Sequence, residues 1–362
     1  MIKILHVLTT LDKGGVATML QSYYQRMNKD CIHFDFLTIS SGKEHLYHKA
    51  FEDLGCNIQY MPKNYFMRMI FLCKYFFSHK YDAIHTHIEY ASVLYILFAK
   101  LAGIKTRIAH SHMAFVEYKS FFQRLCIKLL RKSATDFWAC SHDAAVCLYG
   151  KDISAKSYIL TNAIDTDRFT FNPLIRNQIR ERYNLGESLV VGFVGRLRKQ
   201  KNPLFLIDIF YEIVKRCPDS KLMLLGDGPL INEVKAKASN YGINNKIIFV
   251  GNVLNANEYY QAFDIYLMPS LWEGLGIVYI EAQAAGLMTY SSTMVPKDVE
   301  ISSLMRRIDL SVPASEWAEI IVKDIIAHKR DNTKQTIIEA GYDVKENVKN
   351  IENKYIELIG NK

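Results

Sequence analysis

Short apolar runs alternate with longer amphipathic stretches along nearly the whole chain. The apolar runs predict strands at 2–8, 33–39, 57–60, 82–85, 106–109, 136–140, 157–160, 189–194, 221–225, 246–250, 264–267 and 287–291. Between them, apolar residues recur with a period near 3.6, which predicts helices such as 15–27, 90–102, 202–216 and 229–241. Strands that alternate with helices indicate parallel sheets covered on both faces, so the pattern predicts an α/β fold.

The predicted strands exceed what one compact doubly wound sheet holds, and 362 residues correspond to about two domains. The strands fall into two groups separated by a polar stretch. We therefore expect a first domain at 1–165, a connection at 166–188 and a second domain at 189–341. The last stretch, 342–362, has the pattern of a helix.

Composition narrows the class of protein. With 49% apolar and 23% charged residues the chain is globular, which excludes a disordered or collagenous protein. The seven cysteines are odd in number and lack a C-x-x-C pair, so we expect reduced, buried thiols rather than disulfides or a zinc site. No signal-peptide pattern is visible and no apolar run reaches the length of a membrane span, so a cytoplasmic location is expected.

The segment 269–282 is the first candidate for chemistry. It follows an apolar strand, and Gly274 and Gly276 form a turn before a helix. Free N–H groups at a helix N-terminus bind anions. Glu273 and Glu281 stand eight residues apart around this turn, and they suit two parts of one extended ligand. A strand-to-helix turn with two surface acids explains the same spacing.

A second candidate follows the strand at 189–194. Arg196 and Lys201 lie beyond its carboxyl end, where ligands bind in open α/β sheets, and their charges suit a diphosphate. A solvated basic loop is the alternative. Two glycine turns, 226–228 and 14–15, also follow strands. Each would let the backbone approach a ligand, although each alone is typical of a structural turn.

Together these segments resemble the family 4 retaining glycosyltransferases of the GT-B fold, over almost the whole chain. The E-x7-E signature is matched by Glu273 and Glu281, and the G-R-x4-K segment by Arg196 and Lys201. The two glycine turns of the family are matched by Gly226 and Gly228 and by Gly14 and Gly15. The segment 162–169 is similar to the family's N-G-I-D-x-x-x-F segment, with Ala163 in place of glycine. The stretch 295–301 looks similar to exopolysaccharide and capsule biosynthesis members.

The resemblance implies two Rossmann-like doubly wound domains that face each other across a cleft. The first would bind the acceptor, with the C-terminal helix 342–362 packed back on it, and the second would bind the nucleotide sugar. The reaction would be retaining transfer of a hexose-type sugar from a nucleotide-diphosphate sugar, with a UDP-sugar expected, to a glycan or lipid-linked acceptor. It would serve bacterial surface polysaccharide synthesis.

The resemblance also implies roles for individual residues. Arg196 and Lys201 would stabilise the diphosphate leaving group without a metal or other cofactor. Glu273 would hold hydroxyls of the transferred sugar, and Glu281 would accept from the ribose. The remaining donor-binding positions would be Gly14, Gly15, Gly226, Gly228, Gly274, Leu275 and Gly276.

Histidines gather after two strands of the first domain. By resemblance, His112 occupies the place of the family's sugar-contacting histidine, whereas a structural role is favoured for His110. His85 and His87 form a second pair that would line the cleft. These four are ligand types that zinc accepts, but nothing in their spacing demands a metal, and none is expected.

The whole chain has a net charge of +8. Most of this charge lies in the first 165 residues, which carry 20 basic and 13 acidic side chains. Two stretches, 63–80 and 119–132, combine cations with aromatic and aliphatic residues. In the second, Phe122, Leu125, Cys126, Leu129 and Leu130 share one helical face. Such stretches suit docking on an anionic membrane at the inner face of the cell, or their apolar faces pack on the sheet. No nucleic-acid-binding motif is present.

Two other functions remain open at this point. One is a nucleotide-sugar 2-epimerase of the same fold, against which the paired glutamates count. The other is a catalytically silent partner that binds a membrane or nucleic acid and keeps only the fold. The silent protein would show no nucleotide-sugar turnover.

Overall fold

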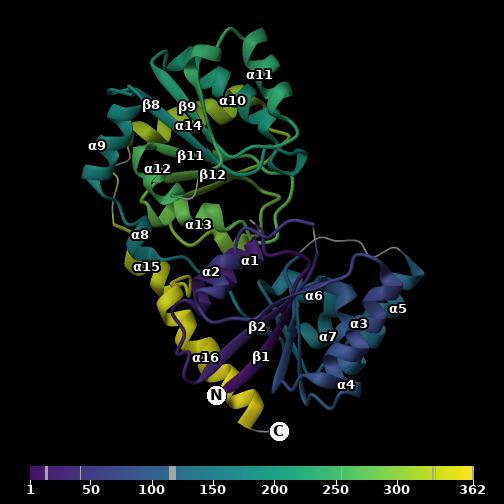
Figure 1. Ribbon diagram of the computed structural model, residues 1–362. Helices are drawn as coiled ribbons and strands as arrows, with labels where there is room; N and C mark the ends of the chain where they lie inside the picture. Colours follow the sequence, from purple (N-terminus) through teal and green to yellow (C-terminus); the bar gives the residue numbers. More distant parts are fainter. Residues whose placement is uncertain are drawn as a thin grey trace. The chain divides into compact units, whose positions relative to one another are not determined.

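The computed structural model describes residues 1–12, 15–40, 42–113, 120–253, 255–327, 330 and 332–360. It divides into two compact units. Unit 1 comprises Met1–Ala163 together with Val344–Lys362, and unit 2 comprises Ile164–Asp343. Each unit contains one sheet of parallel strands with helices packed on it, which confirms the predicted α/β fold (Figure 1).

Unit 1 has a seven-stranded sheet in the order β3-β2-β1-β4-β5-β6-β7. The pairings between these neighbouring strands are all parallel. Its strands are β1 (Ile2–Val7), β2 (Ile32–Ile39), β3 (Ile58–Met61), β4 (Ala83–Thr86), β5 (Thr106–Ser111), β6 (Asp136–Ala139) and β7 (Tyr158–Ile159). Its helices are α1 (Gly15–Tyr24), α2 (His48–Glu52), α3 (Tyr65–Ser78), η1 (Glu89–Ala91), α4 (Ser92–Leu101), α5 (Phe121–Ser133), α6 (His142–Tyr149), α7 (Lys151–Ser154) and α16 (Val344–Gly360).

The two faces of this sheet have separate cores, because neighbouring residues of a strand point to opposite faces. Ile4 packs in a cluster with residues of α1 and α16, among them Tyr355. Leu5 packs in another cluster with residues of α3 and α4. The yellow helix α16 runs beside β1 and β2 (Figure 1). The end of the chain is thus an integral part of unit 1.

Unit 2 has a six-stranded sheet in the order β10-β9-β8-β11-β12-β13. Its strands are β8 (Leu189–Val194), β9 (Ser220–Leu225), β10 (Ile247–Gly251), β11 (Ile265–Met268), β12 (Met288–Ser292) and β13 (Met305–Ile308). Its helices are α8 (Thr166–Phe169), α9 (Pro173–Arg182), η2 (Lys199–Lys201), α10 (Pro203–Arg216), α11 (Ile231–Asn240), η3 (Asn244–Lys246), α12 (Ala256–Ala262), α13 (Ile277–Ala284), η4 (Lys297–Val299), α14 (Ala314–Ala327) and α15 (Lys334–Glu339).

The segment 166–188, expected as a connection, folds into unit 2 as α8 and α9. Arg176 and Arg180 of α9 form ion pairs with Asp264, which directly precedes β11. Three arginines, Arg176, Arg180 and Arg330, donate to carbonyl groups at the carboxyl end of α12. Because cations there complement the helix dipole, the contacts of Arg176 and Arg180 fasten the segment 166–188 to the domain.

The seven cysteines are free, as expected. The expectation of burial holds for Cys56, Cys126 and Cys140, whereas Cys31 and Cys73 are exposed. Among the described residues, no helix has the length and apolar character needed to cross a membrane.

Candidate active site

The carboxyl ends of β8 and β11 bring the first predicted residues together. The loop after β8 leads into η2, and the loop after β11 leads into α13. Leu271 N–H donates to Gln200 O at 2.8 Å, which ties the two loops to each other. Lys201 Nζ donates to Glu273 Oε1 at 2.6 Å. Two residues that the sequence places 72 positions apart therefore form a direct ion pair.

This ion pair is nearly enclosed by protein. The Glu273 side chain is 5% exposed and that of Lys201 is 13% exposed. Ser270 Oγ donates to Glu273 Oε1 at 2.7 Å, and Gln200 Nε2 donates to Oε2 at 3.3 Å. A buried carboxylate is tolerated when it is paired and hydrogen-bonded in this way. Glu273 is consequently held in one orientation, and the alternative of a surface acid does not describe it.

The turn before α13 presents backbone donors next to Glu273. Gly276 has φ +86°, and a Cβ atom there would lie 2.7 Å from the Tyr279 ring, so the turn requires glycine. Within the described chain, the N–H groups of Gly274, Leu275 and Gly276 have no protein acceptor. The Leu275 side chain is buried, which anchors the turn. Such donors, together with the positive end of the helix dipole, suit an anion.

Arg196 lies two residues beyond the end of β8, and its side chain is exposed. Among the described residues no acceptor binds its guanidinium, and Arg196, like Lys201, follows the carboxyl end of β8. The predicted start of the next helix is confirmed at Pro203. Asn202 precedes it in the left-handed conformation at φ 52°, and its side chain makes no capping hydrogen bond.

Glu281 lies on α13 and is held by a different partner. Tyr260 OH donates to Glu281 Oε2 at 2.8 Å. Burial raises the pKa of Glu281 to about 7, against the opposing effects of Tyr260 and Arg168. No hydrogen bond among the described residues joins Glu281 to Glu273. The two glutamates of the predicted signature thus occupy distinct environments on one turn and helix.

Gly226 and Gly228 have a packing reason for being glycine. A Cβ atom on Gly226 would lie 2.1 Å from Gly195 O, and one on Gly228 would lie 2.3 Å from Leu197 O. Both glycines therefore let the loop after β9 approach the loop after β8, and their expected role in donor binding stays a prediction. Gly15 begins α1, and a Cβ atom there would meet nothing within 4 Å. Gly14 lies outside the described residues.

Unit 1 contains its own group of polar side chains at the carboxyl ends of β1, β4 and β5. His112 directly follows β5 and is partly buried, and His87 directly follows β4. His87 Nδ1 and His112 Nε2 are 2.9 Å apart. His110 is fully buried and lies 3.1 Å from His85, measured between His110 Nδ1 and His85 Nε2. The structural role expected for His110 agrees with this burial.

Glu89 is a residue that the sequence analysis missed as part of this group. It has φ 50°, which is unusual for a non-glycine residue, and is only 9% exposed. Its carboxylate accepts from the His112 N–H at 2.7 Å and from Ser111 Oγ at 3.1 Å. The sequence offered one indication of this role, which is that Glu89 stands two residues after the pair His85 and His87.

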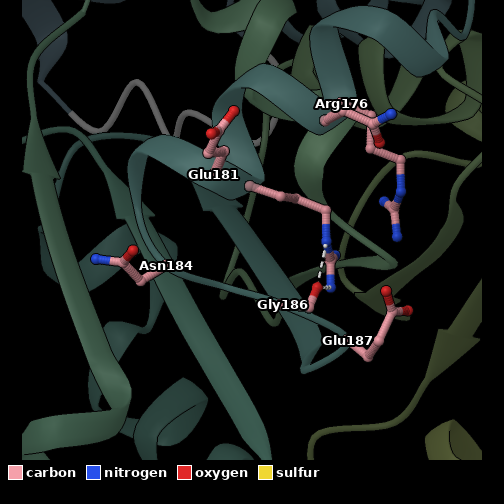
Figure 2. Close-up of a pocket in the computed structure, with 7 residues that line it drawn as sticks. Arg176, Glu181, Asn184, Gly186 and Glu187 are labelled. Carbon is pink, nitrogen blue, oxygen red and sulfur yellow. Dashed lines mark hydrogen bonds between the residues drawn. The ribbon is translucent and has the colours of Figure 1, made fainter.

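Cavities of unit 2 also occur away from these loops. One of about 730 Å³ is lined by residues of α9 and the loop before β8, including Arg180 and Glu187. Gly186 O accepts from Arg180 Nε at 3.0 Å and from Arg180 Nη2 at 2.7 Å, and dashed lines mark hydrogen bonds at Gly186 in Figure 2. Since Leu189 begins β8, this cavity is at the amino ends of the strands. Its arginines are engaged in holding the fold.

Comparisons with known proteins agree with this architecture. The family profile described as "Glycosyl transferases group 1" matches residues 188–323. The chain is 31% identical over 369 residues to EpsF, a Bacillus subtilis (strain 168) protein named as a glycosyltransferase, covering 98% of this chain and 96% of EpsF. It is 24% identical to the capsular polysaccharide biosynthesis glycosyltransferase CapH of Staphylococcus aureus, covering 91% of this chain and 92% of CapH.

Among solved structures, Anabaena HepE in complex with UDP superposes with a TM-score of 0.82 at 18% identity, covering 98% of this chain and all of HepE. At that identity the likeness shows the fold, which is the two-domain GT-B arrangement of parallel-sheet units. The relationship to EpsF extends over nearly the full length of both chains. The chain therefore belongs to the group 1 glycosyltransferase family and is a glycosyltransferase of the GT-B fold.

Proposed function

We propose that this glycosyltransferase moves a hexose-type sugar from a nucleotide-diphosphate sugar, a UDP-sugar in the simplest case, to a glycan or lipid-linked acceptor. The transfer proceeds with retention and without a metal, as in the family 4 enzymes that the chain resembles. The setting is bacterial surface polysaccharide synthesis, which the name of CapH supports. The UDP bound to HepE supports the choice of base.

One observation carries the proposal. Three features lie together in loops at the carboxyl ends of the strands of one sheet. They are the Lys201–Glu273 pair, the unpaired N–H groups before α13 and the exposed Arg196. The N–H groups and Arg196 supply positive potential for a diphosphate, and Lys201 adds its charge. As the sugar leaves, negative charge develops on the diphosphate, and preorganised donors stabilise it.

The carboxylates have separate tasks in this proposal. Glu273 is fixed by Lys201 and Ser270 and accepts from hydroxyls of the transferred sugar. Glu281 accepts from the ribose hydroxyls, with Tyr260 orienting its carboxylate. His112 of unit 1 contacts the sugar or the acceptor hydroxyl.

A thermal-shift screen against UDP, GDP, ADP and their common sugars tests the donor site. A ligand that binds only the native state stabilises it by about 2.7 kcal/mol at a hundred times its Kd. Arg196→Ala is the matched variant, because Arg196 is exposed and its removal leaves the fold intact. We expect a selective rise in Tm with uridine nucleotides and at least about a tenfold weaker Kd in the variant.

The lysine is a poorer variant for this purpose, because Lys201→Ala also unpairs the buried Glu273. No shift with any nucleotide would refute the donor site as drawn. A shift that Arg196→Ala leaves unchanged would remove Arg196 from the diphosphate contact.

We also propose that unit 1 docks on an anionic membrane surface through α3 and α5. On α5, the predicted apolar face divides: Cys126 and Leu130 are buried, whereas Leu125 and Leu129 are exposed. Phe121 and Phe122 are exposed by 82% and 66%. Helix α3 exposes Tyr65, Phe66, Met67, Ile70 and Phe77. Residue 119, at the start of the predicted stretch, lies outside the described residues.

Cations accompany these exposed side chains. Arg124, Lys128, Arg131 and Lys132 of α5 are all exposed. Aromatic residues with surrounding cations are typical of helices that lie in the interface of anionic lipid bilayers. Vesicle co-sedimentation tests this. Phe121→Ser/Phe122→Ser should weaken binding to phosphatidylglycerol vesicles, while binding to phosphatidylcholine vesicles stays low. Equal binding by the double variant and the native protein would contradict the docking surface.

A further inference from the structure

Five histidines of unit 1 form a continuous cluster on one face of its sheet. They are His6 of β1, His85 and His87 of β4 and its end, and His110 and His112 of β5 and its end. Ring centroids of neighbouring members are 4.0 to 5.3 Å apart. The proposed function assigns a task to His112 alone, so the other four need an explanation.

Hydrogen bonds divide the cluster into two chains. In the first, His6 Nδ1 lies 3.0 Å from His87 Nε2, and His87 Nδ1 lies 2.9 Å from His112 Nε2. In the second, Tyr355 OH lies 2.7 Å from His85 Nδ1, and His85 Nε2 lies 3.1 Å from His110 Nδ1. His87 uses both ring nitrogens, and it is the link between the sheet interior and His112.

Burial keeps the rings of the first chain neutral. It lowers the pKa of His6 and of His112 to about 3, and that of His87 well below 6.5. Each neutral ring carries one proton and each hydrogen bond needs one donor. Only two arrangements make both hydrogen bonds: every ring protonated on Nδ1, or every ring protonated on Nε2. The tautomers of the three rings are thus tied to one another.

The buried end of the chain decides between the two arrangements. His6 is fully buried beside the rings of Phe34 and Phe36, and its Nε2 has no partner among the described residues. An orphaned buried N–H is rarer than an unused buried acceptor. His6 Nε2 is therefore the bare nitrogen, so that His6 Nδ1–H donates to His87 and His87 Nδ1–H donates to His112.

We propose that His87, itself fixed by His6, is a positioning residue that holds His112 in the Nδ1–H tautomer. Nε2 of His112 is occupied as an acceptor, and its Nδ1–H is left as a donor on the partly exposed ring. This inference rests on the proposed function for His112. In that function, the Nδ1–H of His112 would donate a hydrogen bond to an oxygen of the sugar or the acceptor. Nδ1 would not act as a general base.

Metal binding is the competing use of these nitrogens. Two triads, His6 with His85 and His87, and His87 with His110 and His112, place ligand atoms within 4.8 Å of one another. However, the closest pairs are at hydrogen-bonding distances, and neither triad includes a carboxylate to offset the charge of a buried dication. Hydrogen bonding explains the spacings without an additional group.

Long-range ¹H–¹⁵N NMR spectra of ¹⁵N-histidine-labelled full-length protein test the proposal, because they distinguish a protonated ring nitrogen from a bare one. Signals of His112 are assigned by comparison with His112→Asn. We expect a single Nδ1–H tautomer in the native protein. In His87→Phe the donor to His112 Nε2 is lost, and we expect both tautomers of His112 in exchange.

His87→Asn provides the rescue, because its amide lies near the position of Nδ1 and can still donate to His112 Nε2. It should restore the Nδ1–H tautomer. In turnover assays, His87→Phe should lower kcat by about tenfold or more with little change in donor KM, and His87→Asn should recover most of it. Tyr355→Phe, which disturbs only the second chain, is the control and should leave the His112 spectrum unchanged.

An Nε2–H tautomer of His112 in the native protein would overturn the proposal. So would an unchanged His112 spectrum in His87→Phe, or one equivalent of zinc in the purified protein. The spectra require no turnover. An expected spectrum without any nucleotide-sugar turnover would leave the positioning role standing and refute the proposed function instead.

Discussion

The Lys201–Glu273 ion pair allows a quantitative test of the site's construction. Its members are 2.6 Å apart and nearly enclosed. Removing one partner of a buried pair costs about 3–5 kcal/mol, because the other charge is left in a poorly solvated position. Lys201→Met keeps most of the aliphatic stem and deletes the charge. We expect a cost of about 3 kcal/mol, at the low end of that range, because Ser270 and Gln200 still donate to Glu273.

Glu273→Gln is the reciprocal change. Its amide oxygen can still accept from Ser270, and Lys201 is nearer to water, so we expect a smaller cost of about 1–2 kcal/mol. The double variant Lys201→Met/Glu273→Gln has no buried charge left to compensate. It should therefore be about as stable as Glu273→Gln alone, so the coupling energy equals the cost of Lys201→Met, about 3 kcal/mol.

Differential scanning calorimetry and urea unfolding of all four proteins measure this cycle. A loss of about 3 kcal/mol corresponds to a Tm decrease of roughly 6–12 °C for a domain of this size. Additive single-variant effects, within about 0.5 kcal/mol, would show that the two charges do not interact in solution. A cost below about 1 kcal/mol for Lys201→Met would equally refute the reasoning, because the pair would then behave as a surface salt bridge.

Three other predictions have defined outcomes. Because the folded-state pKa of Glu281 is raised to about 7, its stabilising contribution is complete below about pH 4.5 and is lost as the pH rises through 7. Between pH 4.5 and 8, the free energy of unfolding of Glu281→Gln should therefore rise by up to about 3 kcal/mol relative to that of the native protein, as measured by urea unfolding. Parallel pH profiles of the two proteins would contradict this. Gly226→Ala places a Cβ atom against Gly195 O and should lower the stability by about 2–4 kcal/mol. Gly242→Ala is the control, because Gly242 has open space around it, and it should cost about 1 kcal/mol. Equal decreases in Tm would argue against the close contact between the loops. Glu89→Ala should cost about 1–3 kcal/mol by leaving the His112 N–H unsatisfied, whereas Ser111 Oγ keeps its bond to Ala144 O. Hydrogen exchange at the end of β5 should accelerate, and unchanged exchange would exclude that role.

The parallel-sheet architecture could be predicted because buried strands are continuous apolar runs. The predicted strand at 189–194 coincides with β8, and the predicted helix at 202–216 differs from α10 by one residue. The strand β13 was missed, because its sequence contains Arg306 and Arg307 and it lies at the sheet edge, where two residues remain partly or fully exposed. Edge strands carry a weaker hydrophobic signal than central ones.

Predicting the site was harder, because side-chain contacts depend on how loops meet. Motif spacing located Lys201 and Glu273 but gave no sign that they pair with each other. The burial of Glu273 depends on Ser270 and Gln200, which belong to no motif considered. Glu89 was missed because its left-handed conformation is a tertiary effect. The histidine chain required the strand order, since β1 and β4 are neighbours in the sheet and distant in sequence.

The helix α16 has a consequence for the order of folding during synthesis. Its residues Ile351 and Tyr355 are fully buried in the same core as Ile4 and Phe34, near the beginning of the chain. Unit 2 has all its residues once Asp343 has left the ribosome, and at that moment unit 1 still lacks one wall of its core. Unit 1 is therefore translated first but completed last. One apolar face of its sheet remains partly exposed until unit 2 and α16 have been synthesised.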